Sequence, residues 1–337
     1  MKLQSDRINK SPQFREGKFR NVNEWIMPPM YKQLGLFWDF IFEGKQRKPN
    51  KVLPYKQVDL SYFNGVSKNN LNATWLGHSS LMINIDGHKI LTDPVFESKV
   101  SAFGPWRFNG KVPLDISKLT EIDVVIISHN HYDHLNKFSI LKIKDRVRKF
   151  ITTLGIAKLL IKWGVSSEKI IELDWNEECE VDSELSITAA PSQHFSGRSL
   201  FDRDETLWAS WVIKGLNHKV FYSGDSGYFD GFKTIGEKYG PFDMTFLECG
   251  AYNERWHHIH MFPEETVQAH IDLKGKVLHP IHWGTFNLAF HPWYEPMQRL
   301  SAAAEQNNVI ITTPIVGETS VFEGELKTLK WWVDNYE

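Results

Sequence analysis

Three imidazoles and one carboxylate lie within six residues in the first half of the chain. They belong to His129, His131, Asp133 and His134, in the order His-x-His-x-Asp-His. Neutral imidazole nitrogens and carboxylate oxygens are groups that zinc and similar divalent cations bind in proteins. In an extended loop the side chains of His129 and His131 would point the same way, while Asp133 and His134 would turn toward a neighbouring position. The spacing therefore predicts two adjacent metal ions rather than one.

The cluster directly follows an apolar run that is rich in β-branched residues, at positions 123–127. Such a run is typical of a buried strand, and the ligands of α/β proteins often bind where strands of this kind end. Three further candidate ligands, His194, Asp225 and His282, each follow another predicted strand in the same way. We therefore expect all seven side chains to meet along one edge of the fold.

Seven ligands divided between two cations leave room for a shared water molecule, as a catalytic metal site requires. We expect the first cation to bind His129, His131 and His194, the second to bind Asp133, His134 and His282, and Asp225 to bridge them. Asp93 also follows a predicted strand and could accept a hydrogen bond from a ligand imidazole. His78 and His279 could act in the same way, although purely structural roles are favoured for both.

The composition is that of a globular protein. The 337 residues, of which 42% are hydrophobic and 24% charged, suffice for one large domain or two ordinary ones. Cys179 and Cys249 lack Cys-x-x-Cys spacing and are too few for a disulfide framework, so a reducing compartment is expected. The N-terminus lacks the apolar segment of a signal peptide, and no run of eighteen apolar residues occurs. We therefore expect a cytoplasmic protein without a membrane-spanning helix.

The chain begins with a basic segment that is rich in aromatic residues. Residues 1–56 contain twelve Lys and Arg against five Asp and Glu, whereas the remainder is acidic. We interpret this segment as an extension of one catalytic domain over residues 57–337. Its apolar run at residues 34–42 either packs on that domain as an extra helix or lies on the surface of a membrane, with lysines over anionic headgroups. The acidic catalytic domain argues against nucleic acid as a partner.

The predicted strands first form hairpins and then alternate with helices. An Asp86-Gly87 turn joins one hairpin, and helices are expected at residues 155–164 and from Pro263 onward. Strands are expected at residues 74–76, 80–85, 88–92, 123–128, 149–152, 169–173, 185–190, 207–214, 218–222, 242–247, 276–281 and 308–312. This order indicates an α/β (α+β) fold in which two mixed sheets pack face to face with helices outside.

Longer motifs surround the candidate ligands. They read TWLGHS at 74–79, PSQHFS at 191–196, GAY at 250–252 and HWGTF at 282–286. Together with the His-x-His-x-Asp-His cluster, they resemble the metallo-β-lactamase superfamily over residues 72–320. Within it, they are similar to the N-acylphosphatidylethanolamine-hydrolysing phospholipase D family and its bacterial relatives. The resemblance implies a four-layer αβ/βα sandwich with two zinc ions at one edge.

The resemblance also implies that His260 faces the substrate. The chain departs from the family pattern at Phe262, where an acidic residue is expected before Pro263. An acid at that position could cap the following helix or order the loop. Its absence leaves the pose of His260, and with it the substrate, open.

The function hypothesis is a dinuclear metal-dependent hydrolase, specifically a phosphodiesterase of phospholipase D type that acts on N-acylphosphatidylethanolamine-like phospholipids. Two cations about 3.5–4 Å apart would activate a water molecule for attack on phosphorus. Asp133 would accept a proton, and His260 would hold the non-bridging oxygens as negative charge builds. The alternatives are a lactonase for a sugar-phosphate lactone and a non-enzymatic zinc-binding scaffold, although structural zinc is normally closed by four ligands rich in Cys. A homodimer and a peripheral membrane location are further options.

Overall fold

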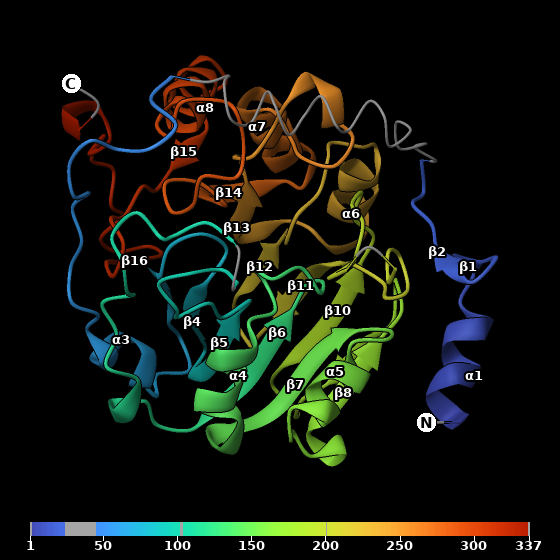
Figure 1. Ribbon diagram of the computed structural model, residues 1–337. Helices are drawn as coiled ribbons and strands as arrows, with labels where there is room; N and C mark the ends of the chain where they lie inside the picture. The colour runs from blue at the N-terminus through green and yellow to red at the C-terminus, as the bar shows by residue number, and fades with distance from the viewer. Residues whose placement is uncertain (1, 24–44, 102–103, 200, 336–337) are drawn as a thin grey trace.

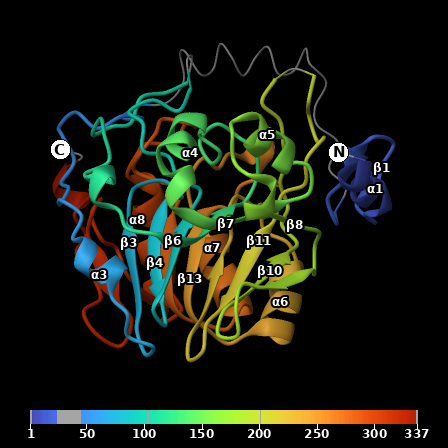
Figure 2. The ribbon, with the colours of Figure 1, turned by 90° about the horizontal axis from the view of Figure 1, so that it is seen from below.

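Two seven-stranded sheets pack face to face in the computed structural model, which describes residues 2–23, 45–101, 104–199 and 201–335. Helices lie outside both sheets (Figure 1, Figure 2). The first sheet is covered by α3 (Leu60–Asn64), α4 (Lys137–Ile143) and α5 (Ala157–Lys162), and the second by α6 (Gly231–Tyr239), α7 (Pro263–Asp272) and α8 (Glu295–Gln306). The predicted four-layer α/β sandwich is therefore confirmed.

Both sheets are mixed. In spatial order the first contains β16 (Thr319–Val321), β3 (Leu71–Trp75), β4 (Leu81–Ile85), β5 (His88–Thr92), β6 (Ile122–Ile127), β7 (Val147–Thr153) and β8 (Ile170–Leu173). The second contains β15 (Ile310–Ile311), β14 (Gly275–Ile281), β13 (Phe242–Glu248), β12 (Lys219–Tyr222), β11 (Ser210–Lys214), β10 (Ser186–Ala190) and β9 (Glu178–Glu180). The described residues also form 3₁₀ helices at Ile116–Lys118, Lys144–Arg146, Ser167–Lys169, Glu254–Trp256 and Val333–Asn335.

The strand directions place several strand ends at one edge. Strands β5 to β8 run parallel in the first sheet, and β12 to β15 run parallel in the second. Strand β10 is antiparallel to β11, which is antiparallel to β12, so β10 points the same way as β12. The loops after β6, β10, β12 and β14, which contain the seven candidate ligands, therefore leave their sheets in a common direction.

Strand β6 shows why the ligand loop is held firmly. Val124 and Ile126 face the core between the sheets, whereas Val125 and Ile127 pack under the outer helices. All four side chains are fully buried. Because successive side chains of a strand point to opposite faces, a strand covered on both sides reads as a continuous apolar run. The loop that follows it at Ser128 thus starts from a rigid support.

The described part of the N-terminal segment lies against the edge of the sandwich near β8. It comprises α1 (Lys2–Lys10), β1 (Phe14–Arg15) and β2 (Lys18–Phe19), at the right of Figure 1. Arg7 Nη1 donates to the Glu172 carbonyl at 2.8 Å, and Phe19 is only 1% exposed. The apolar run at 34–42 lies outside the described residues. Within the part of the chain that is described, no helix has both the length and the apolar character needed to cross a bilayer.

One carboxylate joins the two sheets at the edge opposite the candidate ligands. Asp86, in the turn between β4 and β5, is buried at φ +53°, a left-handed conformation that Asp tolerates. Its Oδ2 accepts from the backbone N–H groups of Asn217 at 2.7 Å and His218 at 3.0 Å, and its Oδ1 lies 2.6 Å from His218 Nδ1. Asp86 therefore ties the β4–β5 hairpin of one sheet to the β11–β12 hairpin of the other.

Replacing this acceptor should loosen the sandwich. We expect Asp86→Asn to lower the free energy of unfolding by about 1–3 kcal/mol, because the amide that replaces one oxygen leaves buried N–H donors without a partner. Asn keeps the left-handed backbone accessible, so the change tests the hydrogen bonds themselves. Chemical denaturation measures the effect, with Glu237→Gln, at an exposed position of α6, as the control. Equal stability of the two variants would contradict the role of Asp86.

Candidate metal centre

The seven predicted ligands come together around Asp225. Its Oδ2 lies 3.2 Å from Nε2 of both His134 and His282, 3.7 Å from His194 Nε2 and 3.9 Å from His129 Nε2. The side chain of Asp225 is only 3% exposed. Four imidazoles from loops of both sheets thus point one nitrogen each at a single buried carboxylate.

The remaining two predicted ligands complete two adjacent groups. His131 Nδ1 lies 2.8 Å from His129 Nε2 and 3.3 Å from His194 Nε2, and Asp133 Oδ2 lies 3.7 Å from both His134 Nε2 and His282 Nε2. Two groups with ligand atoms within 4.8 Å of one another are His129, His131, His194 and Asp225, and His78, Asp133, His134 and His282. Two further groups overlap them, one of Asp225, Glu248, His260 and His282 and one of Asp93, His129 and His134. Each predicted set of three ligands thus falls within one group, with His78 as an added neighbour of the second.

The polar atoms at the centre fit a cation. His134 Nε2, His282 Nε2 and Asp225 Oδ1 are buried and have no hydrogen-bond partner among the described residues. Orphaned buried polar atoms are rare in proteins because each one carries a desolvation cost. Nitrogens bound tetrahedrally to zinc at about 2.0–2.1 Å lie about 3.3 Å from one another. The separations of 2.8–3.9 Å around Asp225 and His131 bracket that value.

Buried acceptors hold the imidazoles in place from behind. His134 Nδ1 donates to Asp93 Oδ2 at 2.7 Å, and the same carboxylate accepts from Ser128 N at 2.8 Å and Tyr222 OH at 2.5 Å. His194 Nδ1 lies 2.9 Å from a backbone carbonyl of the loop before α7. A fixed Nδ1 partner sets the tautomer and directs Nε2 toward the metal position. Asp93 thus occupies the outer position expected from the sequence.

Sequence reasoning missed one group at the same edge, Glu248, and favoured the wrong role for another, His78. His78 Nε2 lies 3.0 Å from Asp133 Oδ2, so His78 is a neighbour of the centre and not a purely structural residue. Glu248, the last residue of β13, is fully buried and lies 2.8 Å from His260 Nδ1. Both residues follow predicted strands, as His194 and Asp225 do. The same rule, applied to every predicted strand, would have identified them. His279 instead packs in the core beside Trp75.

His260 lies beside the two ligand groups. Its ring centroid is 5.2 Å from that of His194 and 5.1 Å from that of His282, and its side chain is 12% exposed. The acid missing at Phe262 is replaced from within the helix, because the Glu265 carboxylate accepts the Phe262 N–H at 2.8 Å. The start of α7 is therefore ordered without an acidic residue before Pro263.

The pKa values divide the buried imidazoles into two sets. Burial lowers the pKa of His129 and His194 well below the usual 6.5. Burial alone would do the same to His134 and His282, but the Asp225 carboxylate raises the pKa of His282 to about 10 and that of His134 well above 6.5. Without a cation, protons on these two rings therefore balance the buried carboxylates.

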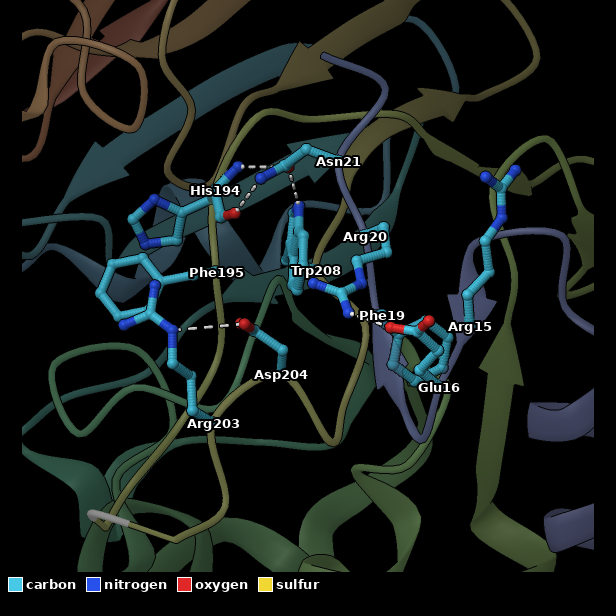
Figure 3. A pocket seen from close by; sticks show the side chains of 10 residues that line it. All are labelled: Arg15, Glu16, Phe19, Arg20, Asn21, His194, Phe195, Arg203, Asp204 and Trp208. Carbon is cyan, nitrogen blue, oxygen red and sulfur yellow. Dashed lines mark hydrogen bonds and ion pairs between the residues drawn. The ribbon is translucent and has the colours of Figure 1, made fainter. Parts of the chain in front are cut away.

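A side chain of the N-terminal segment clamps the backbone at His194. Asn21 Oδ1 accepts the His194 N–H at 3.0 Å and the Trp208 Nε1–H at 3.0 Å, and its Nδ2 donates to the His194 carbonyl at 2.7 Å. Figure 3 shows Asn21 between these two residues, above a cavity of about 470 Å³ that Phe195 and Arg203 help to line. No pattern in the sequence predicts this contact.

Comparisons with known proteins agree with this geometry. A family model described as a β-lactamase superfamily domain matches residues 88–283. An uncharacterized protein of Mycobacterium tuberculosis is 40% identical over 96% of this chain and 87% of its own length. N-acyl-phosphatidylethanolamine-hydrolyzing phospholipase D 1 of Caenorhabditis elegans is 33% identical over 79% of this chain and 78% of its own length. The solved structure of a metallo hydrolase from Ignicoccus hospitalis, at 24% identity, covers 76% of this chain and 100% of its own with a TM-score of 0.57.

The chain belongs to the metallo-β-lactamase superfamily. The resemblance drawn from the motifs is thereby confirmed, and the solved relative supports the fold. Within this superfamily the chain is a metal-dependent hydrolase, and its two groups of His and Asp side chains are able to bind metal. The metallo-β-lactamase fold also explains why loops from both sheets meet at one edge, since that edge is where the strands of the two halves end together.

Zinc affinity should rise with pH between about 6 and 9. His282 and His134 bind metal only as neutral imidazoles, and their raised pKa values mean that a proton must leave each ring first. Each released proton changes the affinity by about tenfold per pH unit. Competition with a chromophoric chelator at several pH values measures this slope. An affinity that does not change with pH would show that neither ring is protonated in the metal-free protein.

Asn21→Ala should weaken zinc binding. The variant removes the hydrogen bonds on both sides of His194 and frees the loop that holds it, so we expect a loss of about tenfold in affinity. Arg20→Ala is a matched control, because Arg20 is the exposed neighbour and pairs with exposed Glu16. Chelator competition on both variants provides the measurement. If the two bind zinc equally well, the clamp has no part in forming the centre.

Proposed function

We propose that two divalent cations, with zinc as the first candidate, bind the seven converging side chains. One cation would be held by His129, His131 and His194, the other by Asp133, His134 and His282, with Asp225 shared. The observation that carries the proposal is the convergence of four buried imidazole nitrogens on Asp225 Oδ2. Cys is absent from both groups, which is the donor set of a catalytic rather than a closed structural zinc site.

We further propose that the centre hydrolyses phosphodiesters. A pair of divalent cations supplies Lewis acidity, which lowers the pKa of water and stabilises charge on phosphoryl oxygens. The protein must supply the remaining functions. Asp133 is the carboxylate placed to take a proton from attacking water, because its side chain is 16% exposed whereas Asp225 is 3% exposed. The hydrogen bond from buried His78 keeps the Asp133 carboxylate in one orientation.

His260 is the second residue to which we assign a catalytic role. Its Nδ1 is occupied by Glu248, so the opposite ring nitrogen, Nε2, is left to contact a non-bridging phosphoryl oxygen. Because Nδ1–H is donated to Glu248, Nε2 can donate to that oxygen only when the ring carries both protons. An imidazolium fixed in this way would stabilise negative charge as it builds in the transition state, without having to reorganise. Like Asp133, His260 is partly exposed, as a residue that contacts the substrate must be.

The substrate class we propose is an N-acylphosphatidylethanolamine-like phospholipid, cleaved in the manner of a phospholipase D. The support is the 33% identity over most of the chain to the Caenorhabditis elegans enzyme whose name states that activity. The excess of Lys and Arg in residues 1–56 suits a protein that meets anionic lipid at a membrane surface. A sugar-phosphate lactone is the alternative substrate, because an activated water attacks a lactone carbonyl as well as phosphorus.

Loss of central ligands should abolish hydrolysis. We expect His131→Ala and Asp225→Asn to lower turnover of bis-p-nitrophenyl phosphate by at least about a hundredfold and to reduce bound zinc. His88→Ala, at the far end of β5, is the control and should keep both zinc and turnover. Parallel assays with N-acylphosphatidylethanolamine vesicles and a lactone panel identify the bond. Turnover of lactones alone would reject the phosphodiesterase, and wild-type turnover in both variants would reject the centre.

A further inference from the structure

Glu248 lies where its backbone is fixed and its side chain is fully buried. It is the last residue of β13 and pairs with Ile281 in the parallel ladder with β14, one residue before His282. Its N–H donates to Ser223 Oγ at 3.1 Å, and its carbonyl accepts from Thr266 Oγ1 at 2.8 Å. The position of the carboxylate is therefore set by the second sheet and α7 together.

The carboxylate fixes the tautomer of His260. Glu248 Oε1 accepts the Met261 N–H at 2.7 Å, and Oε2 lies 2.8 Å from His260 Nδ1. Burial raises the pKa of the Glu248 carboxyl, and the adjacent His260 ring counteracts this shift. In its ionised state the carboxylate can only accept hydrogen bonds, so the proton between these two atoms then belongs to Nδ1. The adjoining N–H of Met261 prevents the carboxylate from turning away from the ring. His260 is thus held at one angle with Nε2 directed away from Glu248.

The same oxygen also faces the metal-ligand candidate His282. Glu248 Oε2 lies 3.8 Å from His282 Nδ1, which has no hydrogen-bond partner in the described part of the chain. The Nε2 atom of that ring points the other way, to Asp225. The backbones approach closely here, because a Cβ on Gly250 would lie 2.2 Å from the His282 carbonyl oxygen. At 3.8 Å the contact between Glu248 and His282 Nδ1 is electrostatic rather than a hydrogen bond.

We infer that Glu248 is a positioning residue that serves two imidazoles at once, orienting His282 toward the metal centre and His260 toward the substrate. This inference rests on the proposed function, the His282 half on the metal centre and the His260 half on phosphodiester hydrolysis. One carboxylate would then link the strength of metal binding to the placement of the catalytic histidine. A fully buried carboxylate is costly to desolvate, and it is retained only where hydrogen bonds compensate for the lost water.

The experiment compares Glu248→Gln with Glu265→Gln. Gln at 248 keeps the size of the side chain but places an amide N–H₂ where an oxygen accepted, so His260 either loses its hydrogen bond at Nδ1 or changes tautomer. Glu265 is the matched control, because its carboxylate accepts a backbone N–H of the same loop and touches neither imidazole. The amide oxygen of Gln can still accept that N–H, so the start of α7 stays ordered in Glu265→Gln. We expect Glu248→Gln to weaken zinc binding by roughly 10–100-fold and to lower kcat at saturating zinc by a similar factor. Glu265→Gln should change neither by more than about twofold.

A double variant separates the two roles. In a His260→Ala background, Glu248→Gln should cost little further kcat, within about twofold, because its catalytic effect acts through the missing ring. The loss of zinc affinity should persist there, because it acts through His282. The inference would be overturned if the kcat loss of the double variant equalled the product of the losses in the two single variants. Unchanged zinc affinity in Glu248→Gln would also overturn it.

A spectroscopic measurement tests the wild-type protein and needs neither a variant nor turnover. Nitrogen-15 NMR of labelled histidine should show His260 protonated at Nδ1, with Nε2 unprotonated or also protonated, whereas protonation at Nε2 alone would overturn the inference. Zinc affinity and the NMR signature depend only on the position of Glu248. Suppose that the zinc affinities and the NMR signature are as expected here but the wild-type protein hydrolyses no phosphodiester. The proposed hydrolysis would then be rejected, while the positioning role of Glu248 toward His282 would stand.

Discussion

The arrangement around Asp225 is a constraint that the surrounding structure must satisfy. Four imidazole nitrogens lie within 3.9 Å of one carboxylate oxygen that is almost completely buried. Imidazole rings packed so closely repel one another when they are protonated. When they are neutral, their buried nitrogen acceptors lack hydrogen-bond partners. Such a cluster therefore persists only if the surrounding structure holds it rigidly. The twice-covered strand β6 and the buried acceptor Asp93 provide that support from the first sheet.

The support extends to the far edge of the molecule. Ligands come from both sheets, so the geometry of the centre depends on how the sheets sit on each other. The apolar core between them allows some sliding, whereas the hydrogen bonds of Asp86 are directional and fix the two hairpins in register. At the ligand edge, residues such as His78 and His282 adopt left-handed backbone conformations, with φ of +57° and +63°. Such strain is tolerated where the surrounding structure over-determines the backbone.

Much of the centre could be predicted because its ligands are recognisable from short stretches of sequence. The spacing of His129, His131, Asp133 and His134 lies in one loop, and the apolar run before it identifies the supporting strand. His194, Asp225 and His282 obey the same strand-end rule, and the order of strands and helices was enough to predict two mixed sheets.

The missed contacts depend on register between distant segments. Glu248 reaches His282 only because β13 pairs with β14 in one particular alignment, and no local pattern specifies that alignment. Asn21 contacts His194 across 173 positions of the chain, from a segment whose composition suggested only a basic extension. His78 was undervalued for a different reason, since a single histidine after a strand is more often an ordinary buried residue.

The contact of the N-terminal segment with the His194 loop also affects the order in which the protein can fold. Phe19 and Asn21 leave the ribosome early, but their partners Asp204 and Trp208 are made almost two hundred residues later. Synthesis runs at about 5–20 residues per second, so roughly ten to forty seconds pass before these partners are made. During this time the Phe19 ring, which is buried in the folded protein, contacts solvent or a chaperone. Residues 19–21 can therefore dock only after residues 204–208 have been made.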